Sequence, residues 1–127
     1  MSLTAQEMVD RAIEMRPVLQ GKAAEFEANR QISKDVIDEM QQARIFDTIA
    51  PKRWGGLGLP LAAQVRVSEE LARGDASVSW VHYILSFGSW MVSLLPDAGQ
   101  EEVFAEGVPR VGGIGGPPWE AAKAEVG

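Results

Sequence analysis

One histidine and four serines recur at helical spacing in the apolar stretch that follows Asp75. They are Ser79, His82, Ser86, Ser89 and Ser93. Side chains three and four positions apart share one face of a helix. Such a polar stripe either lets another helix approach closely, with each hydroxyl bonded back to its own helix, or borders a cavity that holds a ligand. Packing is the more common case. The four aromatic residues of the same stretch favour a cavity for a flat molecule, and we expect the serine-lined side to border it. These aromatic residues are Trp80, Tyr83, Phe87 and Trp90.

The chemistry open to His82 is limited, because it is the only histidine and the chain has no cysteine. A zinc or iron site needs several such ligands, so no metal site is expected. A Ser-His-Asp triad would need this same histidine, but no nucleophile-elbow sequence accompanies it. We expect a buried histidine whose ring nitrogens are hydrogen-bonded. No catalytic residue is assigned to this chain.

Two glycine clusters share residues with nucleotide-binding loops but lack the rest of those motifs. The segment 113–116, Gly-Ile-Gly-Gly, leads into two prolines, so no helix N-terminus follows it to receive a phosphate. The segment 55–58, Gly-Gly-Leu-Gly, lacks the Lys and Ser/Thr of a P-loop. We interpret both clusters as structural turns.

Composition indicates one soluble domain that binds neither nucleic acid nor membrane. The 127 residues are 46% hydrophobic and 24% charged, with a net charge of −6 and no basic cluster that could neutralise phosphates. The uncharged stretch between Asp75 and Asp97 is long enough to span a bilayer. However, serines and Gly88 interrupt it and no basic residues flank it, so a buried helix is favoured. The first residues lack a signal-peptide pattern, which predicts a cytoplasmic protein.

The element that carries these residues is the fourth of about five predicted helices. The five ranges are 3–28, 33–44, 60–73, 76–95 and 97–106. Pro17 should bend or divide the first helix, and Asp75 should cap the fourth. The third should pack Leu61, Val65, Ser68 and Ala72 inward, or Leu71 on an adjoining face. A short extended piece is expected at Phe46–Ala50. The predicted fold class is an all-α helical bundle over residues 1–106, followed by a Gly/Pro-rich tail over residues 107–127.

Two motifs in this layout resemble a known family. They are "PKRWGGLGLP" at residues 51–60 and "SEELARGDASVSW" at residues 68–80, ahead of the long apolar helix. Together they resemble the N-terminal helical domain of the acyl-CoA dehydrogenase superfamily. The run Asp75-Ala76-Ser77-Val78-Ser79-Trp80 and the spacing from Trp80 to Trp90 are most similar to the branch of flavin-dependent two-component hydroxylases, which are monooxygenases acting on phenols, indoles and related aromatic compounds.

The resemblance implies a helical domain, a middle β-barrel that holds much of the flavin, and a C-terminal helical bundle that drives oligomer formation. Residues 107–127 would then lead into the barrel. The chain would be the substrate-side domain of a flavin-dependent oxidoreductase, an aromatic hydroxylase in preference to a dehydrogenase, and incomplete as a catalyst alone. We expect FAD or FMN in the complete enzyme and no flavin on this chain alone. The implied partners are an aromatic or acyl substrate, a flavin reductase and further copies of the chain.

Residue by residue, the resemblance implies a pocket along the fourth helix. Trp80 matches a family tryptophan close to the isoalloxazine ring and the substrate, and Ile84, Phe87 and Gly88 would lie on the same pocket side. Gly88 stands where such hydroxylases often place a substrate-contacting histidine, so a roomier pocket is expected. The alternative is a non-catalytic helical interaction or oligomerisation module whose uncovered apolar faces promote association. A third reading is a truncated frame of a longer enzyme.

Overall fold

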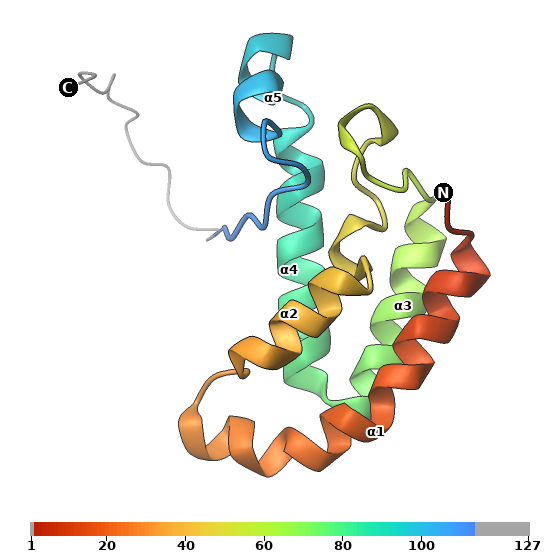
Figure 1. The fold of residues 1–127 in the computed structure, drawn as a ribbon, viewed down its shortest axis with the longest axis vertical. Helices are drawn as coiled ribbons and strands as arrows, with labels where there is room; N and C mark the ends of the chain where they lie inside the picture. Colours follow the sequence, from red (N-terminus) through yellow and green to blue (C-terminus); the bar gives the residue numbers. More distant parts are fainter. Residues whose placement is uncertain (1, 114–127) are drawn as a thin grey trace, which may run out of the picture.

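A computed structural model describes residues 2–113, and the tail predicted beyond Gly113 lies outside this range. The elements are α1 (Ala5–Asn29), α2 (Lys34–Gln42), the short 3-10 turns η1 (Ile45–Asp47) and η2 (Lys52–Trp54), α3 (Leu61–Gly74), α4 (Ala76–Val92) and α5 (Asp97–Val103). These five α-helices, with no strand among the described residues, confirm the predicted all-α bundle. Figure 1 shows α1, α3 and α4 side by side, with α2 and η1 laid across them and α5 at the far end of α4.

The first helix keeps its continuity past Pro17 but changes direction along its length (Figure 1). It begins with a capping box, in which Thr4 accepts from the Glu7 backbone while the Glu7 carboxylate accepts from that of Thr4. Its buried face is the one that the apolar spacing predicts. This face comprises Met8, Val9, Ala12, Met15, Leu19 and Phe26.

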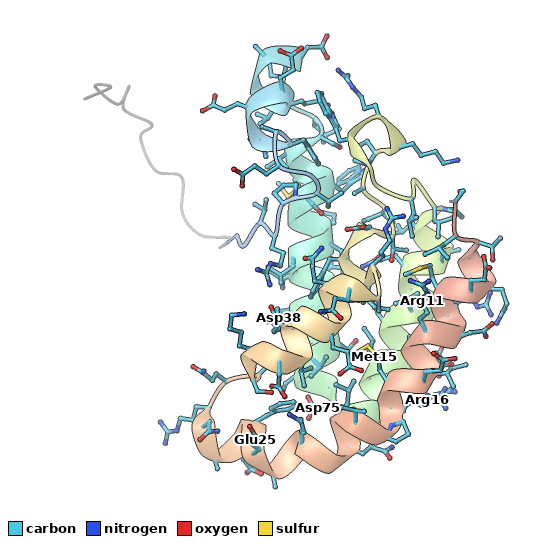
Figure 2. All side chains as sticks on the ribbon, viewed as in Figure 1. Arg11, Met15, Arg16, Glu25, Asp38 and Asp75 are labelled. Carbon is cyan, nitrogen blue, oxygen red and sulfur yellow. The ribbon has the colours of Figure 1, made fainter. Side chains whose placement is uncertain are left out.

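Two arginines of α1 tie the bundle together at its surface. Arg11 donates to the carbonyl of Ala43, just after α2, over 2.8 Å. Arg16 forms an ion pair with Glu70 of α3. Figure 2 labels both arginines on α1, with Met15 between them in the sequence. These contacts fix the long first helix against elements that come much later in the chain.

The predicted extended piece at Phe46–Ala50 is wrong. The chain forms η1 and a following turn instead, in which the amide of Asp47 donates to Arg44 and that of Ala50 donates to Asp47. Five of the six residues 45–50 are buried, and the sixth, Ile49, is half-buried. A lone extended segment would leave its buried amides unpaired, and local turns satisfy them without a partner strand.

The inward face of α3 also differs from the expectation. Leu61 and Val65 are 63% and 59% exposed, whereas Gln64, Val67 and Leu71 are buried. The helix α3 carries apolar residues on several of its own sides, so their spacing alone does not determine which side faces the core. The helix is held by two neighbours, α1 on one side and α4 on the other, and the buried set is the one that serves both.

The motif at residues 51–60 forms a compact turn that fastens α5 to the rest of the bundle. Gly56 is required there, because a methyl group on it would lie 2.2 Å from the carbonyl oxygen of Ala50. The indole of Trp54 stacks on Phe104 at 5.7 Å and donates to Gln100 over 2.9 Å. The turn is therefore structural, as the sequence predicts.

The fourth helix starts as predicted and ends earlier than expected. The Asp75 carboxylate caps it by accepting from the Val78 amide over 3.0 Å. It stops at Val92, and turn-type hydrogen bonds at Ser93, Leu94 and Leu95 lead to Pro96. Within residues 2–113, no helix combines the length and apolar character that crossing a membrane demands.

Candidate functional site

The polar stripe of α4 packs against protein over most of its length, and its first serine, Ser79, also borders a hollow between α3 and α4. The imidazole of His82 is fully buried, with Nε2 3.0 Å from the carbonyl oxygen of Ile45 and Nδ1 3.1 Å from the hydroxyl of Ser68. The side-chain nitrogen of Gln64 lies 3.4 Å from Nε2 of His82. The ring thus joins α4 to α3 and to η1, and the expectation of a buried, hydrogen-bonded histidine is confirmed.

Most serines of the stripe mark close helix packing, and a cavity on their side is present only where Ser79 and Trp80 line the hollow between α3 and α4. Ser79 donates to the carbonyl of Ser68 on α3 over 2.6 Å. Ser86 and Ser89 are buried, and Ser89 donates to the carbonyl of Ser86 on its own helix over 2.9 Å. Small side chains let α3 and η1 approach here. The hydroxyls of Ser79, Ser89 and Ser93 donate to backbone carbonyls, whereas the buried hydroxyl of Ser86 has no partner among the described residues.

His82 is held neutral by its surroundings. Burial lowers the pKa of the imidazole from 6.5 to about 4, and the hydrogen bond to Ile45 opposes this shift only in part. A neutral ring has one donor and one acceptor nitrogen. The geometry assigns the proton to Nε2, which donates to Ile45, and lets Nδ1 accept from Ser68. Both nitrogens are occupied, so this residue offers no proton to a ligand.

The opposite side of α4 carries an exposed ladder of aromatic rings, which we call the aromatic face. It consists of Trp80, Tyr83, Phe87 and Trp90. Successive ring centroids lie 6.1, 5.7 and 5.4 Å apart, and the two later pairs are stacked. Trp80 is 65% exposed. Four large aromatic side chains in one exposed row are unusual on a monomer and mark a surface that binds something.

The four residues predicted for the pocket fall at different places on α4. Trp80 and Phe87 belong to the aromatic face, and Ile84 is half-buried beside it. Gly88 is buried beneath the segment that follows α5: a methyl group on it would lie 2.0 Å from the carbonyl oxygen of Val111. The extra room expected at Gly88 is therefore filled by main chain, and the ligand contacts of all four residues stay a prediction.

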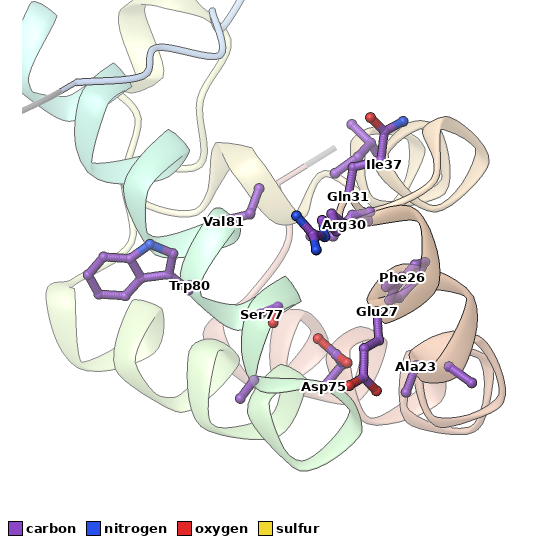
Figure 3. Close-up of a pocket in the computed structure, with 13 residues that line it drawn as sticks. Ala23, Phe26, Glu27, Arg30, Gln31, Ile37, Asp75, Ser77, Trp80 and Val81 are labelled. Carbon is purple, nitrogen blue, oxygen red and sulfur yellow. The ribbon is translucent and has the colours of Figure 1, made fainter.

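Trp80 stands between two hollows. The larger, about 1080 Å³, lies between the second half of α1, α2 and the start of α4, and is lined by Phe26, Ile37 and Val81 among others. Figure 3 shows the side chains of Glu27 and Asp75 entering this groove from opposite walls.

The smaller hollow, about 410 Å³, lies between α3 and α4 and continues the aromatic face. It is lined by Trp80, Tyr83, Leu61 and Val65, and its lining is almost wholly apolar. Sequence reasoning assigned Leu61 and Val65 to the core and so missed this extension. The signal that could have found it is helical spacing, because Gln64, Val67 and Leu71 form a second row three and four positions apart, separate from the row of Leu61 and Val65.

The aromatic face suits the ring system of a flavin and not its phosphates. Its flat, apolar side chains can pack against a planar ring. A phosphate prefers free amides at a helix N-terminus, yet the carboxylate of Asp75 occupies the start of α4. Within the described part of the chain, the acidic and histidine side chains form no cluster of three that could hold a metal ion. The aromatic face can therefore form one wall of a cavity for a planar ligand.

Comparison with known proteins identifies the family of the chain. Residues 4–113 match the family model described as "Acyl-CoA dehydrogenase, N-terminal domain". The chain belongs to this family, as the two motifs predict.

Similar proteins carry flavin-dependent oxygenase names. A pigment production hydroxylase of a Rhodococcus species is 28% identical over 84% of this chain and 27% of its own length. The oxygenase component of an FADH(2)-dependent resorcinol hydroxylase from a Rhizobium species is 27% identical over 78% of this chain and 24% of its own length. The crystal structure of the HsaA monooxygenase from Mycobacterium tuberculosis matches with a TM-score of 0.78 and 25% identity, over 82% of this chain and 28% of that one. The chain spans about a quarter of the length of these relatives.

Proposed function

We propose that these residues form the substrate-side wall of a flavin-dependent aromatic monooxygenase, and that the aromatic face contacts the flavin ring, the substrate or both. The observation that carries the proposal is the exposed row of stacked rings on α4, on a side of the helix distinct from the buried side that holds the His82 network. The names of the relatives favour hydroxylation of an aromatic compound over dehydrogenation of an acyl one.

The wall acts by shape and by excluding water. The hydrogen bonds of His82 to Ser68 and Ile45 hold α4 in one orientation, which keeps the aromatic face ready before a ligand arrives. The face carries no charged group, so a ligand packed on it loses contact with water. A bound flavin would supply the oxygen-activating redox chemistry. Trp80, Tyr83 and Phe87 would position the planar reactants against it.

The finer parts of the proposal follow from the same relatives. The name "oxygenase component" of one relative supports a separate flavin reductase as a partner. The name FADH(2)-dependent in the same relative favours FAD over FMN, while other relatives name only flavin. Assembly into a homo-oligomer and a cytoplasmic location stay predictions from the sequence.

A titration tests the proposal. Reduced FAD, reduced FMN and a simple phenol are added anaerobically to the 127-residue chain and to a polypeptide extended past Gly127. We expect tight binding only for the extended protein, because the described residues supply a wall and no phosphate site. Equally tight flavin binding by the 127-residue chain would contradict the division of roles, and no binding by either would contradict the proposed function.

The second candidate is a helical interaction module without catalysis. The exposed apolar side chains that favour it lie on α3, α4 and the turn after α4, including Leu61, Val65, Met91 and Leu94. Such a surface promotes association of the free chain. Light scattering over a range of concentrations should show reversible association of the 127-residue chain. If the extended protein no longer associates in this way and also binds neither flavin nor phenol, the module is favoured.

A further inference from the structure

A segment of main chain lies directly on α4 at Gly88. After α5 the chain turns at Gly107, whose φ is 104° and whose amide donates to Phe104 over 3.0 Å. Residues 108–113 then run back beside α4, as Figure 1 shows in dark blue. At Val111 the approach is so close that a methyl group on Gly88 would lie 2.0 Å from its carbonyl oxygen and 2.8 Å from its carbonyl carbon.

This approach uses a position where glycine is otherwise unfavourable. Glycine in a helix interior is less stable than alanine by roughly 0.5–1 kcal/mol, because its backbone loses more conformational freedom on folding. Gly88 lies within the second half of α4 and is buried. The clash is with backbone atoms of Val111, which cannot rotate aside as the end of a side chain can. The absence of a side chain at 88 is therefore what admits the segment.

We infer that Gly88 is a positioning residue that seats residues 108–113 on α4, so that the main chain at Val111 forms a fixed rim beside the aromatic face. The inference rests on the proposed function only in assigning that rim to a ligand cavity. Gly88 lies one helical turn after the half-buried Ile84 and therefore on the same side of α4, which places the seated segment on the flank of the helix that Ile84 shares with the aromatic face. A ligand on the aromatic face would then be bounded on this side by backbone, and its width would be limited by Val111.

The seat is tested on the complete 127-residue chain with two helix glycines. Gly88→Ala should detach residues 108–113, because the added methyl group and the Val111 carbonyl cannot share the same space. Trypsin cleavage after the exposed Arg110 should then become about tenfold faster, since cleavage follows the population of the open segment. Gly21→Ala is the matched control: Gly21 lies in α1 with nothing within 4 Å of the added methyl group, so cleavage after Arg110 should stay unchanged.

A second readout removes the ambiguity of a merely destabilised helix. Gly21→Ala should raise the midpoint of thermal unfolding, whereas Gly88→Ala should not raise it. In Gly88→Ala, trypsin cleavage at Arg73 within α3 should stay as slow as in the parent chain. In the unaltered protein, nuclear Overhauser contacts between the α-protons of Gly88 and Val111 should be present, so the seat remains testable if Gly88→Ala does not fold. Absence of those contacts would overturn the inference.

Two results together would also overturn it: unchanged cleavage after Arg110 and a raised thermal midpoint in Gly88→Ala. These readouts need no flavin or substrate. A seated segment in a protein that binds no flavin would reject the proposed function and keep the seat. A protein that binds the ligand while residues 108–113 stay detached from α4 would keep the proposed function and reject the seat.

Discussion

At the residue scale, the two sides of α4 separate structure from function. His82 drew attention as the single histidine of the chain, and its two ring nitrogens prove to be used by Ile45 and Ser68. Trp80 drew attention through a motif, and it is 65% exposed beside two hollows. The residue with the more reactive side chain is thus a packing group, and the chemically inert indole lies where a ligand can reach it.

The buried imidazole makes stability depend on pH. Its pKa is about 4 in the folded chain against 6.5 for a free side chain, so below pH 6.5 the unfolded state takes up a proton that the folded state refuses. The contribution of neutral His82 to the free energy of unfolding is fully present above pH 6.5. It is lost as pH falls toward 4, by an amount on the order of 3 kcal/mol. Urea unfolding of the parent and of His82→Gln between pH 4 and 7 checks this. The variant should be less stable at pH 7 and should lack this loss, and parallel curves would contradict the assignment.

Residue-level reasoning from the sequence reached the types of contact but not their partners. The satisfied histidine followed from side-chain chemistry, whereas the serines were expected to border a cavity and mostly pack against protein. Which groups satisfy His82 depends on η1 and α3, whose positions come from the folded chain. The crowding at Gly88 was missed for the same reason, because Val111 is distant in the sequence and adjacent only in space.

At the scale of elements, helix starts and the buried face of α1 were predictable, and the buried face of α3 was not. Asp75 as the cap of α4 and the glycine-rich turn at 55–58 are local signals, and both were confirmed. The face of α3 depends on two neighbours at once, so the apolar pair Leu61 and Val65 was wrongly assigned to the core. The 3-10 turn η1 was taken for an extended piece because its apolar residues carry no helical period.

The contribution of the α4 cap to stability should be measurable by comparison with the uncapped start of α2. Asp75→Ala removes a carboxylate that accepts from the Val78 amide over 3.0 Å, and should cost about 1 kcal/mol of unfolding free energy. Ser33 occupies the same position before α2 without a side-chain capping bond. Ser33→Ala should therefore cost clearly less in the same chemical denaturation experiment. Equal losses for the two variants would show that the cap is not what anchors α4.

The turn after η2 should be intolerant of any side chain at Gly56. Gly56→Ala places a methyl group 2.2 Å from the carbonyl oxygen of Ala50, and should destabilise the protein by about 1–3 kcal/mol, as overpacking does elsewhere. Gly21→Ala, which meets open space, should instead stabilise it by about 0.5–1 kcal/mol. Thermal unfolding of the two variants gives the comparison, and a stabilised Gly56→Ala would refute the tight turn.

At the scale of the whole molecule, the family is shown and the activity is proposed. The match to the acyl-CoA dehydrogenase N-terminal domain covers residues 4–113, and the two motifs predicted it because they encode the turn and the capped helix on which this fold depends. The chain spans about a quarter of the relatives' length. Its activity, cofactor and partners are therefore proposals.

The central claim is that the aromatic face of α4 is the contact wall for a planar ligand. The most direct measurement is the affinity of the polypeptide extended past Gly127 for reduced flavin and for a phenol, with Trp80→Ala compared with Ile13→Ala. Ile13 is an exposed apolar residue of α1, away from the face. Losing one aromatic contact should weaken binding about tenfold for Trp80→Ala and leave it unchanged for Ile13→Ala. Equal affinities for both ligands in the two variants would contradict the account.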